Sequence, residues 1–245
     1  MKLLQSDKPL VSVRDLHKSF GDLHVLTGID LDLEPGSATA IIGPNGSGKT
    51  TLLKCVLGLA APSQGRIEVA GRTVGRDVSY RSLIGYMPQT PSFPDNLSGR
   101  EVVSLIQSMR DNRSRTDRAL EELFRLNGEM EKPVRTLSGG TRQKISAVLA
   151  FMYEPSLLIL DEPTAGLDPV ASTALKDHIR QKRDGGAAVV LTSHVLSDLE
   201  ELCDRVVCLI GGRIRFDGTL GAIRERTGER RLERAVATLL TRETA

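Results

Sequence analysis

The stretch of sequence that decides the fold runs from residue 38 to residue 50 and reads ATAIIGPNGSGKT. Its first part, Ala38–Ile42, is an apolar and partly β-branched run of the kind that forms a buried strand. The residues after it match the pattern G-x-x-x-x-G-K-[ST] without a mismatch, and they are Gly43, Pro44, Asn45, Gly46, Ser47, Gly48, Lys49 and Thr50. The stretch therefore predicts a strand, a glycine-rich loop and a helix, which we expect from Lys49 to Leu59.

A loop of this kind binds phosphate for identifiable physical reasons. Its glycines let backbone N–H groups turn inward around an anion, and the N-terminus of the following helix adds positive potential. Lys49 supplies a charge for the β- and γ-phosphates, the Thr50 hydroxyl can ligate Mg²⁺, and Thr51 completes the predicted contacts. A merely flexible glycine-rich turn is the alternative, and the strand before it and the helix after it argue against that reading.

Three more candidate residues follow apolar runs that we predict to be strands. Asp161 and Glu162 follow Leu157–Leu160, and His194 follows Ala187–Thr192. The carboxyl ends of parallel strands meet at one edge of a sheet, where ligands bind. We expect Asp161 to hold Mg²⁺, Glu162 to act as general base toward water, and His194 to contact the γ-phosphate. An isolated histidine is more often structural, so position alone does not decide His194.

Composition narrows the class of protein. The chain has 245 residues, of which 40% are hydrophobic and 26% charged, with a formal net charge of +2. This balance gives no basic footprint for nucleic acid, and 3% aromatic residues offer few platforms for stacking bases. Three cysteines argue against a disulfide framework. No signal peptide or run of about 20 apolar residues is evident. We expect a cytoplasmic protein that lies on the inner face of the membrane only through a partner.

The remaining pattern indicates one α/β domain over residues 1–228 with a helical insertion at about 90–150. Strands alternate with helices, which is typical of a doubly wound sheet. Predicted short strands are Leu10–Val13, Gly28–Leu33, Arg66–Val69, Ile84–Met87 and Val206–Ile210, and predicted helices are Gly99–Met109, Arg115–Leu126, Ala171–Arg183 and Leu196–Cys203. The tail, 229–245, has apolar residues at helical spacing. It reads either as an amphipathic helix that docks on this domain or a partner, or as a frayed terminal helix.

The pentapeptide Leu137-Ser138-Gly139-Gly140-Thr141 resembles the signature motif of the ABC ATPase family. Together with the phosphate loop and Asp161-Glu162, it gives the chain a resemblance to that family. The resemblance covers nearly the whole chain, and its one departure is Thr141, where glutamine is commonest. It implies a P-loop NTPase fold with a parallel sheet, an antiparallel β subdomain and an inserted helical subdomain. It also implies ATP hydrolysis coupled to transport, with ATP and Mg²⁺ as cofactors.

The resemblance further implies a head-to-tail pair of subunits with two ATP molecules between them. The residues themselves agree with this arrangement. Ser138 and the backbone of Gly139 and Gly140 open a helix and form a second anion-binding terminus, which has no obvious anion in its own subunit. The expected partners are a second copy of the chain and an integral membrane permease.

Other family positions carry over one by one. Phe20 matches the aromatic residue that stacks on adenine, the alternative being a core or hairpin residue. Gln89 matches the glutamine that senses the metal and the γ-phosphate and links to the helical subdomain. Asp168 matches a loop that contacts the opposing subunit, although it also reads as a helix N-cap before Pro169. His194 matches the switch histidine.

The kind of transporter is a narrower question. A compact helical insertion favours an exporter-type permease. Three stretches resemble the ATPase of the Nos transporter, which serves copper-site maturation of nitrous-oxide reductase, and they are residues 93–101, 142–145 and 193–202. The alternatives are a multidrug or lipid exporter ATPase and a non-transport ABC ATPase such as a cluster-assembly ATPase. We expect Cys55, Cys203 and Cys208 to be core residues and not copper ligands.

Overall fold

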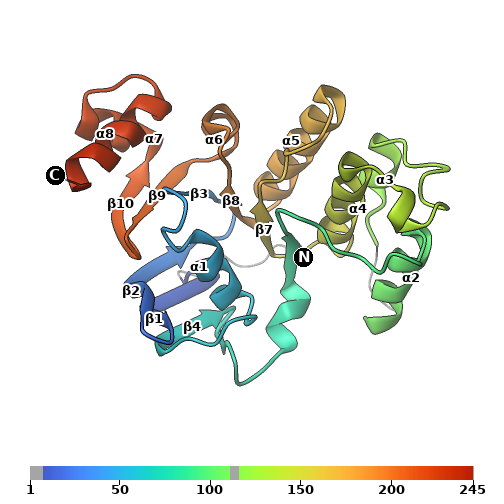
Figure 1. Ribbon diagram of the computed structural model, residues 1–245, viewed down its shortest axis with the longest axis horizontal. Coiled ribbons are helices and arrows are strands. Elements are labelled where there is room, and N and C mark those ends of the chain that lie inside the picture. The colour runs from blue at the N-terminus through green and yellow to red at the C-terminus, as the bar shows by residue number, and fades with distance from the viewer. Residues whose placement is uncertain (1–7, 111–115, 245) are drawn as a thin grey trace.

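The computed structural model describes residues 8–110 and 116–244, with side chains described to residue 241. Within these ranges the strands form two sheets (Figure 1). The larger sheet has the order β10-β9-β3-β8-β7-β6, in which β3, β6, β7, β8 and β9 are parallel and β10 is antiparallel to β9. Its strands are β3 (Ala38–Ile42), β6 (Ile84–Met87), β7 (Leu157–Asp161), β8 (Ala188–Thr192), β9 (Arg205–Ile210) and β10 (Arg213–Thr219).

Both faces of the larger sheet are buried, as its continuous apolar strands predict. In β3, Ala38, Ala40 and Ile42 pack into one hydrophobic cluster, whereas Ile41 packs into the other. The cluster on the Ile41 side contains residues of α1 (Lys49–Val56) and of the smaller sheet. The opposite cluster contains residues of α2 to α8. The phosphate loop leaves β3 between two neighbouring strands and is therefore held by the centre of the sheet.

The smaller sheet is antiparallel, with the order β2-β1-β4-β5. Its strands are β1 (Val11–Phe20), β2 (Leu23–Leu33), β4 (Gln64–Val69) and β5 (Arg72–Thr73). The strands expected at Leu10–Val13 and Gly28–Leu33 were too short. Register shifts interrupt the pairing of β1 with β2, and Asp15 has a left-handed φ of 44°. A bulge of this kind breaks the alternation by which a strand is recognised in sequence.

The helices between β6 and β7 gather at one end of the molecule (Figure 1). They are α2 (Gly99–Met109), α3 (Ala119–Leu123) and α4 (Gly139–Phe151), with a short 3-10 helix at Val134–Thr136. Another short 3-10 helix, Ser79–Leu83, directly precedes β6. The bounds of α2 are those predicted, and a capping box of Ser98 and Glu101 fixes its start. The helix predicted over Arg115–Leu126 begins outside the described residues and ends earlier, because Arg125 takes a left-handed φ of 51°.

The helices that follow β7 pack on the same face of the larger sheet as α4, opposite α1, and the last two lie at the opposite end of the molecule from α2 and α3 (Figure 1). They are α5 (Pro169–Asp184), α6 (Leu196–Leu202), α7 (Leu220–Thr227) and α8 (Leu232–Thr244). Neither β10 nor α7 was predicted. The tail helix α8 buries Leu232, Ala235 and Leu239 against its own chain, in contact with α6 and α7. It therefore docks on this domain, which was one of the two readings of the tail.

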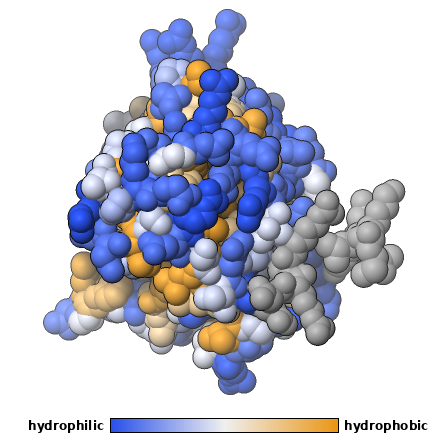
Figure 2. Space-filling view, turned by 90° about the vertical axis from the view of Figure 1, so that its right-hand side faces the viewer, coloured by the Kyte–Doolittle hydropathy of each residue, from blue (hydrophilic) through white to orange (hydrophobic). Residues whose placement is uncertain are grey.

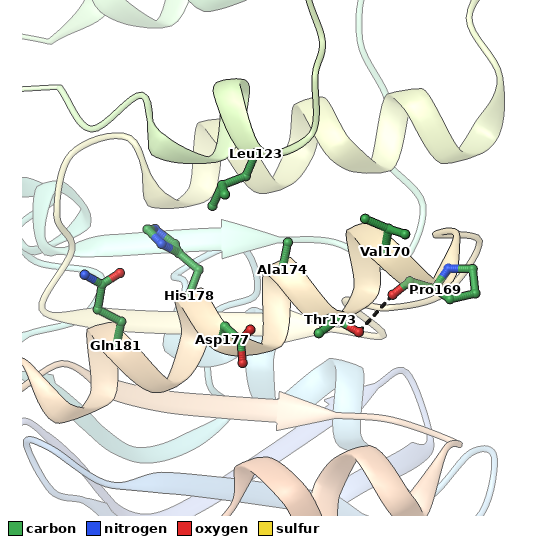
Figure 3. A pocket seen from close by; sticks show the side chains of 8 residues that line it. All are labelled: Leu123, Pro169, Val170, Thr173, Ala174, Asp177, His178 and Gln181. Atoms are coloured by element: carbon green, nitrogen blue, oxygen red, sulfur yellow. Dashed lines mark hydrogen bonds between the residues drawn. The ribbon is translucent and has the colours of Figure 1, made fainter.

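A groove of about 740 Å³ runs along α5 toward α3 (Figure 3). Its lining consists of Leu123, Pro169, Val170, Thr173, Ala174, Asp177, His178 and Gln181. The ring of His178 is buried and packs against Phe151, with 5.1 Å between the ring centroids. None of the residues predicted to contact nucleotide lines this groove.

Candidate nucleotide-binding site

The predicted residues leave the sheet at one edge. Pairing aligns Met87 of β6 with Leu160 of β7, and Asp161 of β7 with Thr192 of β8. Because β3 pairs in parallel with β8, the phosphate loop emerges beside the segment that carries His194. Gln89, Asp161-Glu162, His194 and the phosphate loop therefore follow adjacent parallel strands, at the edge where ligands bind in such sheets.

The phosphate loop is clamped tightly at its two ends. Gly43 has φ +154°, and a Cβ atom there would lie 2.1 Å from the Leu209 carbonyl oxygen. Gly48 has φ +104°, and a Cβ atom there would lie 2.7 Å from a methyl of Leu26. Between them, the hydroxyl of Ser47 is buried and has no hydrogen-bond partner. Such a group costs free energy unless a ligand satisfies it, so the loop fits an anion.

Lys49 is held inside the curve of the loop. Its Nζ atom donates to the carbonyl oxygens of Gly43 at 2.7 Å and Pro44 at 3.1 Å. Burial lowers the pKa of Lys49, and the charges of Asp161 and Glu162 oppose that shift. Neutral carbonyl oxygens therefore position the ammonium. Negatively charged phosphate oxygens are stronger acceptors and can replace them.

The two acidic residues after β7 have different surroundings. The Thr192 hydroxyl donates to Oδ1 of the buried Asp161. Glu162 is also buried, has a left-handed φ of 53°, and donates its amide to the Thr192 carbonyl oxygen at 3.1 Å. Burial raises the pKa of Glu162, against the opposing effects of the His194 backbone and charge. A raised pKa suits a group that must accept a proton near neutral pH.

His194 faces Glu162 from the end of β8. Its Nε2 atom lies 3.7 Å from Oε1 of Glu162, and its side chain is 62% exposed, compared with 11% for Glu162. The carboxylate is therefore enclosed, and the imidazole covers it from the solvent side. The role of His194 as the switch histidine stays a prediction.

Sequence reasoning gave no role to Gln143, which lies next to the general-base candidate. The Gln143 side chain is buried in α4, and its Nε2 atom donates to the Glu162 carbonyl oxygen at 3.2 Å. It ties the helix that begins at Ser138 to the backbone of Glu162. In the sequence, Gln143 could have been noticed as a polar residue on the apolar face of the predicted helix, because buried polar side chains need hydrogen-bond partners.

The turn at Ser138 opens α4 and is exposed. The Ser138 Oγ atom accepts from the Thr141 amide at 3.0 Å and lies 2.9 Å from the Thr141 hydroxyl. A Cβ atom added at Gly139 would meet nothing within 4 Å. Thr141, which departs from the usual glutamine, therefore helps to hold the serine hydroxyl. In Figure 1, α4 lies with the helical group at one end of the molecule, apart from α1.

Asp168 is the N-cap of α5, as its local sequence predicted. Its Oδ1 atom accepts from the Ala171 amide at 2.9 Å, Pro169 follows at the first helical position, and Lys144 Nζ donates to Oδ2 at 2.7 Å. The hydrogen bond from Lys144 lowers the pKa of Asp168. The loop before α5 is thereby attached to α4, and contact with an opposing subunit stays a prediction.

Phe20 and Gln89 lie at the periphery. Phe20 ends β1 at the hairpin, where it pairs with Leu23 of β2. Phe20 is 54% exposed, and the ammonium of Lys18 lies 4.6 Å from the centroid of its ring. Phe20 is therefore a hairpin residue and not a core residue, and stacking on adenine stays a prediction. Gln89 is exposed and follows β6 by two residues. Lys49, Asp161, Glu162 and His194 interact electrostatically with one another across the site.

The packing of the signature turn gives a testable contrast between two neighbouring glycines. A Cβ atom at Gly140 would lie 2.7 Å from the Gly166 carbonyl oxygen, so Gly140→Ala forces backbone to move. Overpacking costs about 1–3 kcal/mol, and helix propensity returns at most about 1 kcal/mol. We expect the Tm of Gly140→Ala to fall by about 2–8 °C. Gly139→Ala is the matched control and should not lower Tm. Equal Tm values for the two variants in calorimetry would contradict the contact.

Comparison with known proteins settles the family. The family model described as "ABC transporter" matches residues 26–165, which is more than half of the chain and includes the phosphate loop, the signature turn and Glu162. The chain belongs to the ABC transporter family. As an ABC ATPase it binds and hydrolyses ATP, and the family uses Mg²⁺ with the nucleotide.

Named relatives agree with this membership. The chain is 36% identical over 225 residues to "ABC-type transporter ATP-binding protein EcsA" of Bacillus subtilis, covering 89% of this chain and 91% of that protein. It is 35% identical over 229 residues to "Daunorubicin resistance ATP-binding protein DrrA3" of Streptomyces coeruleorubidus, covering 91% and 72%. A solved "ATP binding subunit of ABC transporter" superposes with a TM-score of 0.87 at 33% identity, covering 94% of this ABC ATPase and 99% of that chain. The predicted fold is confirmed.

Proposed function

We propose that this ABC ATPase works as a head-to-tail pair that clamps two ATP molecules and energises a separate membrane permease of the exporter type. The observation that carries the proposal is the division of anion-binding elements within one chain. The phosphate loop, with its buried unpartnered Ser47 hydroxyl, belongs to one half-site, and the exposed turn at Ser138 belongs to another. In the proposed pair, the Ser138 turn of one copy completes the site at the phosphate loop of the other copy.

Each residue of the proposed half-site has a distinct task. The loop from Gly43 to Gly48 offers its amides to the phosphates, and Lys49 adds its charge. Thr50 and Asp161 provide the oxygen ligands that Mg²⁺ prefers, and the Thr192 hydroxyl orients Asp161. The ion, when bound, neutralises charge on the phosphates. Asp168, before α5, is proposed to contact the facing copy.

Glu162, His194 and Gln89 are proposed to act on the attacking water. Glu162 accepts the proton from water, for which its burial and raised pKa suit it. His194 covers the carboxylate and contacts the γ-phosphate. Gln89 connects the metal and γ-phosphate to the helical subdomain, and Phe20 stacks on adenine. Catalysis then rests on positioning and charge stabilisation, as in phosphoryl transfer generally.

The burial of Glu162 makes the pH dependence of turnover testable. Glu162 acts as a base only when ionised, and burial raises its pKa above the usual value of roughly 4.3. Asp161 reinforces the shift, while Lys49 and His194 oppose it. Activity should be complete at higher pH and fall as pH drops through a midpoint above about 4.3. A pH profile of kcat/KM, with circular dichroism at each pH to show intact fold, measures this. A midpoint at or below the usual value would contradict the assignment.

Export through a partner is supported by the relatives and by the surface of the helical group. One named relative is a drug-resistance ATP-binding protein, and another is a "Nod factor export ATP-binding protein I". Among the described residues, no helix has the length and apolar character needed to cross a membrane. The helical group exposes apolar residues at Leu105, Met109 and Leu123, and Figure 2 shows apolar patches within the mainly hydrophilic surface at this end. We propose that the permease docks near residues 89–97 and these helices.

Co-purification tests the coupling to a permease. A tagged chain, extracted from membranes of its own host in mild detergent, should retain an integral membrane protein in about equal amount. Met109→Glu should reduce that recovery, because it places a charge on an exposed apolar position of α2. Ala237→Glu, on exposed α8 at the opposite end, is the matched control. Purification of the chain with no membrane protein would contradict the transporter role and favour a non-transport ABC ATPase.

The three stretches that resemble the Nos ATPase raise the question whether the chain itself could bind copper. All three cysteines are buried, and burial raises the pKa of Cys203 to about 12. The described part of the chain contains no group of three or more His, Cys, Asp or Glu residues that could hold a metal ion. A role in copper-site maturation would thus depend on cargo that the permease recognises. We propose an exporter ATPase without assigning the cargo.

A further inference from the structure

Asp198 is not among the site residues predicted from the sequence. It lies in the first turn of α6, and its side chain is only 15% exposed. Its Oδ2 atom accepts a hydrogen bond from the Thr164 hydroxyl at 2.8 Å, and its Oδ1 atom accepts one from Lys176 Nζ at 3.3 Å. One carboxylate therefore joins three elements: the loop after β7, the helix α5 and the helix α6.

Two of these elements carry the residues that face each other in the site. Thr164 stands two residues after Glu162, in a turn where the Ala165 amide donates to the Glu162 carbonyl oxygen at 3.2 Å. The helix that holds Asp198 starts two residues after His194, and the Asp198 amide donates to the Val195 carbonyl oxygen at 3.1 Å. Asp198 thus cross-links the loop of Glu162 to the segment of His194.

A cross-link is needed there because the backbone at this point is strained. Glu162 has φ +53°, a left-handed conformation that costs about 1–3 kcal/mol and persists only where surrounding contacts enforce it. Thr192 fixes the strand ends through its carbonyl oxygen, which accepts from the Glu162 amide. Beyond the strand ends, the His194 backbone hydrogen-bonds the Glu162 side chain, and the Thr164–Asp198 hydrogen bond is a further link between the two segments. It is charge-assisted and mostly shielded from water, so it is strong.

We propose that Asp198 is a positioning residue that, through Thr164, holds Glu162 and His194 in the facing geometry required for ATP hydrolysis. The proposal rests on the proposed function of Glu162 and His194. The side chain of Asp198 contacts Thr164 and Lys176, and its proposed effect on the site passes through Thr164. It acts by fixing the separation of the two segments, for which the 3.7 Å between His194 Nε2 and Glu162 Oε1 is the observable.

A purely structural role for Asp198 predicts different behaviour. Lys176 also pairs with Glu201 on the same helix, and Glu201 in turn contacts Arg180. If Asp198 served only to attach α6 to α5, then Glu201→Ala should be as harmful as Asp198→Ala. Asp198→Asn separates the two roles further, because an amide oxygen still accepts from Thr164 while the charge toward Lys176 is lost.

Steady-state ATP hydrolysis by the full chain tests the proposal. We expect Asp198→Ala and Thr164→Val each to lower kcat about tenfold, the effect of losing one hydrogen bond to a charged group, with KM for ATP unchanged within about twofold. Thr164→Ser, Asp198→Asn and Glu201→Ala should each keep kcat within about twofold of the parent. The kcat of the double variant Thr164→Val/Asp198→Ala should be no lower than that of the less active single variant, because each single change already removes the same hydrogen bond.

The imidazole resonance of His194 gives a readout that global stability does not move. The chain has four histidines, so labelled histidine spectra can be assigned by His194→Ala. The resonance should shift in Asp198→Ala and Thr164→Val but not in Glu201→Ala. Additive losses in the double variant, or an unshifted resonance with normal kcat, would overturn the proposal. Failure of the proposed function looks different: Glu162→Gln would then retain turnover, whatever the Asp198 variants do.

Discussion

Glu162→Gln should bind ATP as tightly as the parent protein and hydrolyse it about 100 to 10,000 times more slowly. Glutamine has nearly the same shape, so the buried side chain and the backbone hydrogen bonds to Thr192 and Gln143 stay in place. It cannot accept a proton from water, so the chemical step loses its base. Phosphate release measures turnover, and equilibrium dialysis with ATP measures binding.

The stability of this variant provides its control. Burial raises the pKa of Glu162, which means that the fold disfavours the ionised form at neutral pH. A neutral amide removes that cost, so Tm should stay level or rise. Glu201→Gln, a change of the same chemistry at a half-exposed position on α6, should leave turnover unchanged. Near-normal turnover by Glu162→Gln would remove Glu162 from the role of base.

Gly139→Asp should abolish ATP-driven pairing and lower ATP hydrolysis at least about 100-fold, while single copies still bind ATP within about twofold. A Cβ atom at Gly139 meets nothing within 4 Å in its own chain, so the change does not disturb the fold. An aspartate near the start of α4 is favourable with the helix dipole, so Tm should not fall. In the proposed pair, however, its charge would face the γ-phosphate of the other half-site and repel it.

Gly139→Ala is the matched variant for this prediction, because it adds a side chain without charge. It should reduce pairing and hydrolysis much less than Gly139→Asp. Light scattering with and without ATP measures pairing, and the phosphate assay measures turnover. Equal pairing by the two variants would mean that the turn at Ser138 does not face a phosphate, and the composite site would then be wrong.

The parts of the fold that could be predicted are those whose pattern is local. The strand Ala38–Ile42 and the loop after it were predicted from one stretch, and α2 was predicted to its bounds because a capping box marks its start. The length of β1 could not be predicted, because the bulge at Asp15 hides its alternation. The early end of α3 depends on the left-handed Arg125, which nothing in the local sequence demands.

The site residues likewise fall into those that local sequence could predict and those that it could not. Residues at or just beyond the ends of sheet strands, such as Asp161 and His194, could be placed at one edge of the sheet from the predicted strands. Gln143 and Asp198 could not, since each acts on a segment far away in the chain. Their polar groups are identified only when the fold shows what they contact. The buried Ser47 hydroxyl without a partner is likewise visible only in three dimensions.

Crosslinking between single-cysteine copies tests the composite site most directly. Asn45 in the phosphate loop and Thr136 before the signature turn are both exposed, so each can be changed to cysteine in the Glu162→Gln background. The native cysteines are buried, which leaves the introduced thiols as the reactive ones. Mixing the Asn45→Cys copy with the Thr136→Cys copy should give a covalent dimer when ATP is present and little without it, and neither copy alone should do so. A mixture that gives no ATP-dependent dimer would contradict the claim that the phosphate loop of one copy meets the Ser138 turn of another.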